Sequence, residues 1–158
     1  MATDPEPEAS RPKRLGLRRF DHVSLVVPNS EEALAFYSKL LGSEIADAHD
    51  WPAEGMRVAY LWFPNRQARI EIMEPLGEDS FLHKFLRQRG PGVHHVTFEV
   101  EDIQQAAAYL KDEMGIEPFR GVWSDGEWKQ TFVHPKDAFG VLLQFFEWEP
   151  GMKPPGFP

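Results

Sequence analysis

Two stretches of the chain repeat the same order of apolar and polar positions. Residues 20–44 and 93–117 each begin with alternating apolar and polar residues, continue through a polar turn, and then place apolar residues three and four positions apart before a glycine. Alternation is typical of a half-buried strand, and spacings of three and four are typical of an amphipathic helix. Each stretch is therefore predicted to form a strand followed by a helix.

The two predicted helices have separate candidates for their first residues and apolar faces. Ser30 and Asp102 are the expected N-caps, because short polar side chains there can accept a backbone N–H. The apolar face of the first helix comprises Ala33, Leu34, Phe36, Tyr37, Leu40 and Leu41. That of the second comprises Ile103, Ala106, Ala107, Leu110 and Met114.

Further strand-like segments follow each helix, and loops rich in Gly, Pro and Asp separate them. These segments are MRVAYLWFP (56–64) and ARIEIMEP (68–75) in the first half, and WKQTFVHP (128–135) and GVLLQFFEWEP (140–150) in the second. A short helix of about residues 80–89, with Ser80 or Asp79 as its cap, joins the halves. The coarse pattern is βαβββ twice, so the predicted fold class is α+β.

An internal repeat supports a duplicated unit. At an offset of 73 residues and without gaps, His22 aligns with His95, and Gly42 aligns with Gly115. The predicted divisions are a disordered tail over residues 1–17, a first βαβββ module over 18–78, a linker helix within 79–92, a second βαβββ module over 93–149 and a Pro/Gly-rich tail over 150–158.

The repeat also selects the polar residues that are candidates for a metal site. The same offset relates Glu71 to Gln144, each of which is a polar residue between apolar strand neighbours. Two histidines, a carboxylate and an amide oxygen are a credible ligand set for a divalent ion. The alternative is that Glu71 and Gln144 face solvent. His95 is preferred to His94 because adjacent strand residues point to opposite faces, and His94 is expected on the core side.

Composition and charge narrow the classes of partner. The formal net charge is −8, which argues against a general affinity for nucleic acid or anionic membranes. The absence of cysteine excludes disulfides and thiolate ligands and fits a cytoplasmic location. We expect no membrane span and no secretory signal, since no apolar run is long enough and the N-terminus is rich in acids and prolines.

Several motifs resemble the vicinal-oxygen-chelate superfamily, which includes glyoxalases, bleomycin-resistance proteins, extradiol dioxygenases and methylmalonyl-CoA epimerases. The resemblance is closest to the epimerases. It lies in DHVSLVVPNSEEALAFY (21–37), EPLGEDSFLHKFL (74–86), GVHHVTFEVEDI (92–103) and FVHPKDAFGVLL (132–143). The resemblance implies two βαβββ modules that form a curved, eight-stranded mixed sheet around a metal-binding cleft.

Carried over to this sequence, the resemblance implies a metal held by His22, Glu71, His95 and Gln144. The ion is one of Co, Mn, Ni, Zn or Fe, since these ligands do not distinguish among them. Relatives often form homodimers, so a homodimer is expected. A small acyl-CoA is the implied substrate, and Arg57, Lys129 and Lys136 are candidate contacts for its phosphates.

Gln144 departs from the resemblance, because epimerases usually carry a glutamate there. An amide has no titratable proton and cannot be a general base. Glu71 is thus the candidate catalytic residue, and Glu99 is a second, weaker one. Glu147 follows Gln144 by three residues and is expected on the opposite face of its strand.

The leading hypothesis is a metal-dependent isomerase that epimerises a 2-acyl-CoA thioester through a metal-stabilised enolate. A glyoxalase-like lyase acting on a different carbonyl substrate is the first alternative. A dioxygenase is the next, although in that group the carboxylate ligand is expected at the Gln144 position. A binding protein without catalysis is the last alternative, and the retained ligand types count against it.

Overall fold

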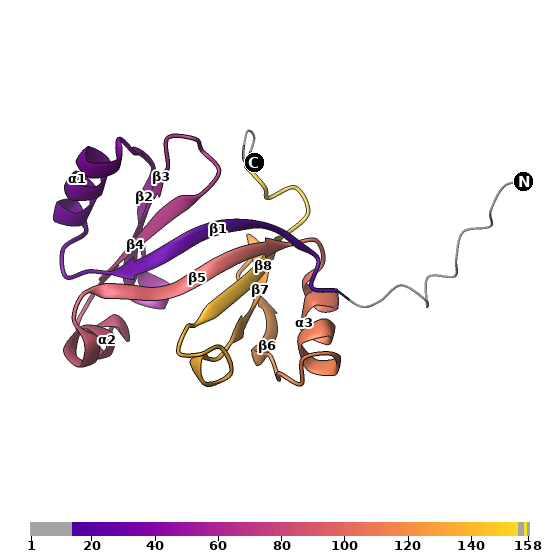
Figure 1. Ribbon diagram of the computed structural model, residues 1–158. Coiled ribbons are helices and arrows are strands. Elements are labelled where there is room, and N and C mark those ends of the chain that lie inside the picture. Colours follow the sequence, from indigo (N-terminus) through magenta and orange to yellow (C-terminus); the bar gives the residue numbers. More distant parts are fainter. Residues whose placement is uncertain (1–13, 155–156, 158) are drawn as a thin grey trace, which may run out of the picture.

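The computed structural model describes residues 14–154 and residue 157 and has three helices and eight strands (Figure 1). The first half comprises β1 (Leu17–Val26), α1 (Ser30–Leu41), β2 (Glu44–Trp51), β3 (Met56–Trp62) and β4 (Arg69–Pro75). The linker helix is α2 (Leu82–Arg89). The second half comprises β5 (Gly92–Val100), α3 (Ile103–Asp112), β6 (Phe119–Ser124), β7 (Trp128–Val133) and β8 (Leu143–Trp148). The predicted α+β class and the duplicated βαβββ pattern are confirmed.

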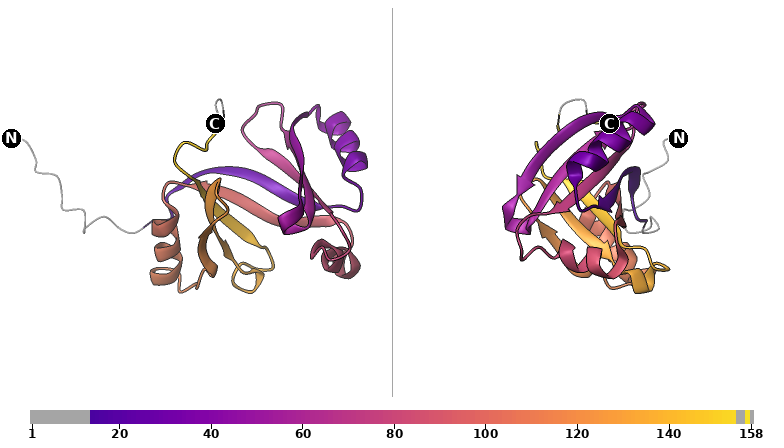
Figure 2. Two further views of the ribbon diagram at one scale, coloured as in Figure 1. Left: turned by 180° about the vertical axis from the view of Figure 1, so that it is seen from behind. Right: turned by 90° about the vertical axis from the view of Figure 1, so that its left-hand side faces the viewer.

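All eight strands form one open sheet in the order β2-β3-β4-β1-β5-β8-β7-β6. β1 is parallel to β4 and β5 is parallel to β8, whereas β1 and β5 are antiparallel to each other. The long β1–β5 pair therefore joins the two modules at the centre of the sheet, and α1 and α3 lie at its two ends (Figures 1 and 2). The strands that carry the repeated polar residues are the four central ones.

The outer strands β2 and β6 were not located by the hydrophobic pattern. Every residue of β2 is exposed except Trp51, and β6 has no buried residue. Edge strands exposed on both faces need no alternation of apolar and polar side chains. The predicted βαβββ pattern includes these two strands, but the sequence did not indicate which residues form them.

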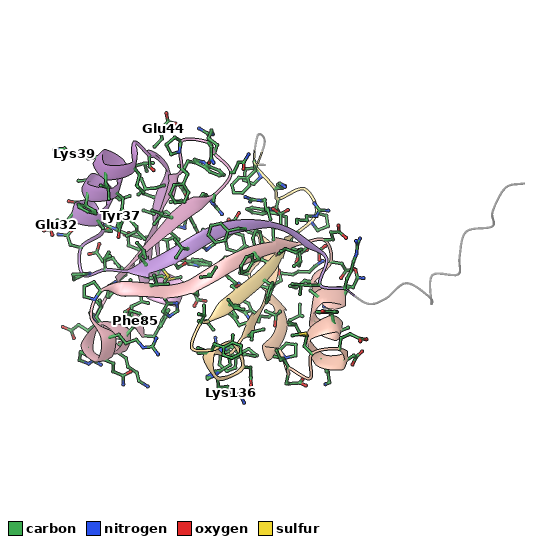
Figure 3. The ribbon with its side chains drawn as sticks, viewed as in Figure 1. Glu32, Tyr37, Lys39, Glu44, Phe85 and Lys136 are labelled. Carbon is green, nitrogen blue, oxygen red and sulfur yellow. The ribbon has the colours of Figure 1, made fainter. Side chains whose placement is uncertain are left out.

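The sheet has an outer face covered by helices and an inner face that holds polar residues. Leu61, Ile70 and Ile72 pack against α1, and Val133 and Phe145 pack against α3. Neighbouring strand residues point to the opposite face. Consequently Tyr60 and Glu71 of the first module, and Phe132 and Gln144 of the second, lie on the inner face. α2 packs against that side through Phe85 (Figure 3).

The repeat extends to the way each helix begins. Glu74 Oε2 accepts the backbone N–H of Ser30 at 2.8 Å, and Glu147 Oε2 accepts that of Ile103 at 2.9 Å. Glu74 and Glu147 are 73 positions apart in the sequence, as are Ser30 and Ile103. Carboxylates at these positions satisfy free N–H groups and interact favourably with the helix dipole. Glu147 thus lies on the outer face, as its spacing from Gln144 predicted.

Two of the three α-helices begin differently from the sequence predictions. Asn29, not Ser30, is the side-chain cap of α1, since Asn29 Oδ1 accepts the N–H of Glu32 at 3.1 Å. Asp102 caps α3 as predicted. α2 begins at Leu82 and not at residue 80, but the hydroxyl oxygen of the predicted cap Ser80 accepts the N–H of Leu82 at 3.4 Å.

Two residues assigned to the apolar face of α1 were placed wrongly. Phe36 and Leu40 are more than half exposed. They lie four positions apart and so share the outer side of the helix, while Leu34, Tyr37 and Leu41 contact the sheet. Seven of the twelve residues of α1 are apolar, more than the side of the helix that contacts the sheet can accommodate, so the sequence alone predicted too broad an apolar face.

The two predicted tails fall partly outside the described residues. Of the N-terminal tail, Leu15 packs against the core beneath α3, and Gly16 accepts the N–H of Glu101 at 2.8 Å. Near the C-terminus, Phe157 contacts the rings of Trp62 and Trp148. Among the described residues, no helix is long and apolar enough to cross a membrane.

Candidate metal centre

Three side chains with metal-binding atoms meet on the inner face of the sheet. His22 from β1, Glu71 from β4 and His95 from β5 are all buried, and their potential ligand atoms lie within 4.8 Å of one another. Glu71 Oε2 is 3.6 Å from Nε2 of each histidine. Residues distant in the sequence converge here because β1 pairs with both β4 and β5.

Gln144 of β8 joins this cluster through hydrogen bonds. Its Oε1 accepts the hydroxyl of Thr97 at 2.7 Å, and its Nε2 donates to Gln130. The Thr97 hydroxyl is also 2.9 Å from His22 Nε2. Its partner in the repeat, Ser24, bonds to Glu71 and lies 2.9 Å from His95 Nε2. The two halves therefore contribute a similar set of contacts.

His94 was placed wrongly by strict alternation. In the β1–β5 ladder, Ser24 faces His95 and Leu25 faces Val93, so His94 is an extra residue in β5. A β-bulge of this kind interrupts the alternation of side chains. His94 accordingly lines the same cavity as His95, and the Nδ1 atoms of the two rings are 2.8 Å apart.

The matching irregularity occurs in β1. Phe20 faces Phe98 and His22 faces Thr97, which leaves Asp21 as the extra residue. The Nδ1–H of His22 donates to Asp21 Oδ2 at 2.6 Å. This contact fixes the hydrogen on Nδ1 and leaves Nε2 directed at the cluster, as is common for metal-binding histidines.

A buried ion-pair network holds Asp21. Arg19 and Arg69 both bond to its carboxylate, and Arg19 Nε also donates to Glu99 Oε2 at 2.7 Å. Burial raises the pKa of Asp21, but the His22 hydrogen bond and the arginine charges outweigh it and hold the pKa well below its usual range. Glu99 is occupied by this network and does not line the cavity beside the cluster.

The electrostatics of the cluster keep Glu71 ionised. Burial raises its pKa, but electrostatic interactions with the His22 and His95 rings lower it. Hydrogen bonds from Ser24 and from the Tyr60 hydroxyl, the latter at 2.6 Å, act in the same direction, so the pKa lies below its ordinary value. Burial and then the Glu71 charge raise the pKa of Tyr60, so its O–H remains a donor.

The two adjacent histidines are held in the neutral form. Burial lowers the pKa of His95 to about 3, even though Glu71 opposes this effect. Burial likewise lowers the pKa of His94. A neutral ring has a free nitrogen lone pair, which is the form that binds a metal.

A cavity of about 320 Å³ opens beside the cluster. Its walls are largely apolar and include Trp51, Met56, Met73, Phe81, Phe119, Trp123, Trp128, Phe132 and Leu142. Glu54 and Arg120 are its charged residues besides Glu71. An apolar cavity with a few converging polar groups is typical of a site for a small molecule.

The three cations predicted to contact substrate do not line this cavity. Arg57 pairs with Asp50 at 2.6 Å, and Lys129 is 3.7 Å from Glu149. Lys136 lies in the loop between β7 and β8 and is exposed (Figure 3). Sequence reasoning missed Arg120, which has a φ of 67° in an irregular part of β6.

The donor set fits a divalent ion. Two donors on one ion at ordinary Zn–N and Zn–O lengths are roughly 3 Å apart, so the observed 3.6 Å separations need only small shifts. Two imidazoles with a carboxylate and an amide oxygen suit several first-row metals. Among the described residues, this is also the one group of three or more such side chains that lies close enough to hold an ion.

The class of protein is defined by two βαβββ modules that share one sheet and by a cluster of two histidines and a carboxylate on its inner face, which is compatible with a divalent metal. The chain belongs to the Glyoxalase/Bleomycin resistance protein/Dioxygenase superfamily, whose family model matches residues 21–133.

Within that superfamily, the chain is similar to methylmalonyl-CoA epimerases. It is 38% identical over 134 residues to the ethylmalonyl-CoA/methylmalonyl-CoA epimerase of Cereibacter sphaeroides, a match covering 80% of this chain and 95% of that protein. The crystal structure of the Mycobacterium tuberculosis epimerase superposes with a TM-score of 0.75 at 31% identity, covering 85% and 91% of the chains. A Streptomyces coelicolor epimerase in complex with 2-nitronate-propionyl-CoA has a TM-score of 0.71 at 28% identity, covering 84% and 98%.

Proposed function

We propose that this protein is a metal-dependent epimerase of a small 2-acyl-CoA thioester. The observation that carries the proposal is the His22–Glu71–His95 cluster beside an apolar cavity, in a chain similar over most of its length to methylmalonyl-CoA epimerases. The structure of a relative with an acyl-CoA analogue supports this substrate class.

His22, Glu71, His95 and Gln144 would hold the ion. A divalent ion there would act as a Lewis acid toward the substrate's carbonyl oxygens, where charge develops as the α-proton leaves. Asp21 orients His22, and the Tyr60 hydroxyl fixes Glu71 through its Oε1. These contacts place the donor atoms before substrate arrives and reduce the cost of ordering them.

Epimerisation requires that one group take the α-proton and that another return a proton to the opposite face. Glu71 is a buried anion at neutral pH and can accept a proton. Glu54 is the other carboxylate among the residues that line the cavity, and we assign it the second proton transfer. Gln144 cannot take part, because its amide does not ionise.

The rest of the cavity supports binding of an acyl-CoA. Its volume of about 320 Å³ suits the small acyl group, and its apolar walls exclude water from the carbanion that forms. Arg120 is exposed at the cavity and is the cation best placed to contact a carboxylate or phosphate of the substrate. Arg57, Lys129 and Lys136 remain weaker candidates for such contacts.

Incubation with methylmalonyl-CoA in deuterated water tests this proposal directly. With zinc, cobalt or manganese supplied in turn, α-deuterium should enter the thioester at a rate that a chelator abolishes. Glu54→Gln should slow the exchange, whereas Glu31→Gln, at an exposed position in the first turn of α1, should not. If exchange with each bound metal is no faster than the uncatalysed exchange without protein, the epimerase assignment is refuted.

One observation favours a second function at the same site. Because residue 144 is a glutamine, the second half has no titratable group at this position, which favours a glyoxalase-like lyase that acts on another carbonyl substrate. Such a lyase would be detected by formation of a new product, without return of a proton to the α-carbon.

The homodimer and the cytoplasmic location predicted from the sequence remain predictions.

A further inference from the structure

We propose that His94 is a positioning residue that sets the orientation and tautomer of His95 at the metal centre. This inference rests on the proposed metal site. His94 is not one of the predicted metal ligands, and alternation along the strand predicted it on the opposite face. Three observations carry it: the bulge, the contact between the rings, and the equivalence of His94 to Asp21.

The contact itself restricts the chemistry of both rings. When His95 Nε2 binds a metal, the hydrogen of the neutral ring must reside on Nδ1. The atom that faces His95 Nδ1 is Nδ1 of His94, at 2.8 Å. His94 must then accept that hydrogen bond with a free lone pair on Nδ1 and carry its own hydrogen on Nε2.

The position of His94 is held by its packing. Its ring centroid lies 5.2 Å from that of Phe85 and 6.4 Å from that of Phe81, and 5.1 Å from that of His95. Aromatic contacts on two sides limit the rotation of the ring. The lone pair is therefore directed at His95 by packing, while the bulge brings both side chains to the same face.

The repeat provides an independent comparison. Asp21 precedes His22 as His94 precedes His95, each is an extra residue in the β1–β5 ladder, and each contacts Nδ1 of the following histidine. In the first half the acceptor is a carboxylate balanced by Arg19 and Arg69. In the second half the acceptor is a neutral imidazole that stands among aromatic rings.

The comparison also shows which substitution preserves the function. At the bulge in β1, an aspartate side chain reaches Nδ1 of the next histidine at 2.6 Å. Asparagine has the same length and an acceptor oxygen, so His94→Asn should keep the hydrogen bond although it loses the ring. His94→Phe keeps the ring and its packing but has no acceptor. A positioning role and a packing role thus predict opposite rankings of the two variants.

Zinc binding to metal-free protein, measured by titration calorimetry, provides the first test. Loss of a hydrogen-bond partner to a ligand typically weakens metal affinity by about 10–100-fold. We expect that loss for His94→Phe, with His94→Asn closer to the wild type and the control His83→Phe unchanged. His94→Phe binding as tightly as the wild type, or His94→Asn as weakly as His94→Phe, would refute the positioning role.

NMR of the zinc-loaded protein provides a second readout that does not depend on affinity. Hydrogen–nitrogen correlation spectra of the imidazoles should place the hydrogen on Nδ1 in His95 and on Nε2 in His94. The opposite placement in His94 would contradict the proposal. A wild type that binds no zinc would instead overturn the metal site, which separates the failure of the proposed function from that of the positioning role.

Discussion

Acidification should destabilise the metal-free protein through His95. In the folded chain the pKa of this ring falls from its ordinary 6.5 to about 3, because burial disfavours the charged form. Between these values the unfolded chain binds a proton that the folded chain does not. Stability therefore rises with pH in this window, and it is lost as the pH falls below about 6.5.

The size of the effect follows from the shift. At pH 5 the ring is almost fully protonated in the unfolded chain and neutral in the folded chain. The free energy of unfolding therefore falls by about 1.4 kcal/mol for each pH unit below 6.5, and pH 5 lies roughly 1.5 units below that value. The loss attributable to His95 is thus about 2 kcal/mol between pH 7 and pH 5. The result changes little if the folded pKa lies anywhere below about 4.

Urea unfolding in the presence of a chelator measures this loss. The wild type and His95→Gln are compared at pH 7 and pH 5, and the pH-dependent change of the variant is subtracted from that of the wild type. The other titrating groups contribute to both proteins, so the difference isolates His95. Equal pH dependence in the two proteins would show that the buried ring does not resist protonation, and the electrostatic account of the site would be wrong.

Three further substitutions test the site. Glu71→Gln should abolish both zinc binding and α-proton exchange, because it removes the one carboxylate of the cluster; calorimetry and deuterium incorporation check this. Gln144→Glu should keep zinc binding and raise the exchange rate severalfold by adding a titratable group, and an unchanged rate would contradict that reasoning. Arg120→Ala should raise KM for the acyl-CoA with little change in kcat, whereas the control Lys39→Ala, at an exposed position of α1, should leave both steady-state constants unchanged.

Much of the architecture could be predicted because the repeat and the physics of strands agree. Successive strand residues point to opposite faces, and Glu71 and Gln144 each stand between apolar neighbours that pack toward the helices. A second copy 73 positions away then removes the ambiguity of any single match. Strands β2 and β6 were not located because neither contains a buried residue, and without burial there is no alternation of apolar and polar residues in the sequence.

The contacts around the site were beyond sequence reasoning for a different reason. A β-bulge depends on how two strands pair, and neither Asp21 nor His94 differs locally from a residue in regular alternation. The sequence did contain one usable signal, since both residues precede a candidate ligand at equivalent positions of the repeat. Strict alternation along β5 alone assigns His94 to the wrong face, because it takes no account of the pairing of β5 with β1.

The two halves of the site have the same geometry and different charges. The first half supplies both carboxylates, Asp21 beside His22 and Glu71 in the cluster, while the second supplies a neutral imidazole and a neutral amide at the equivalent positions. Negative charge near a bound ion would therefore come from one side. The two proposed proton transfers accordingly both fall to carboxylates of the first half, Glu71 and Glu54. That asymmetry explains why a symmetric fold does not imply a symmetric pair of catalytic bases.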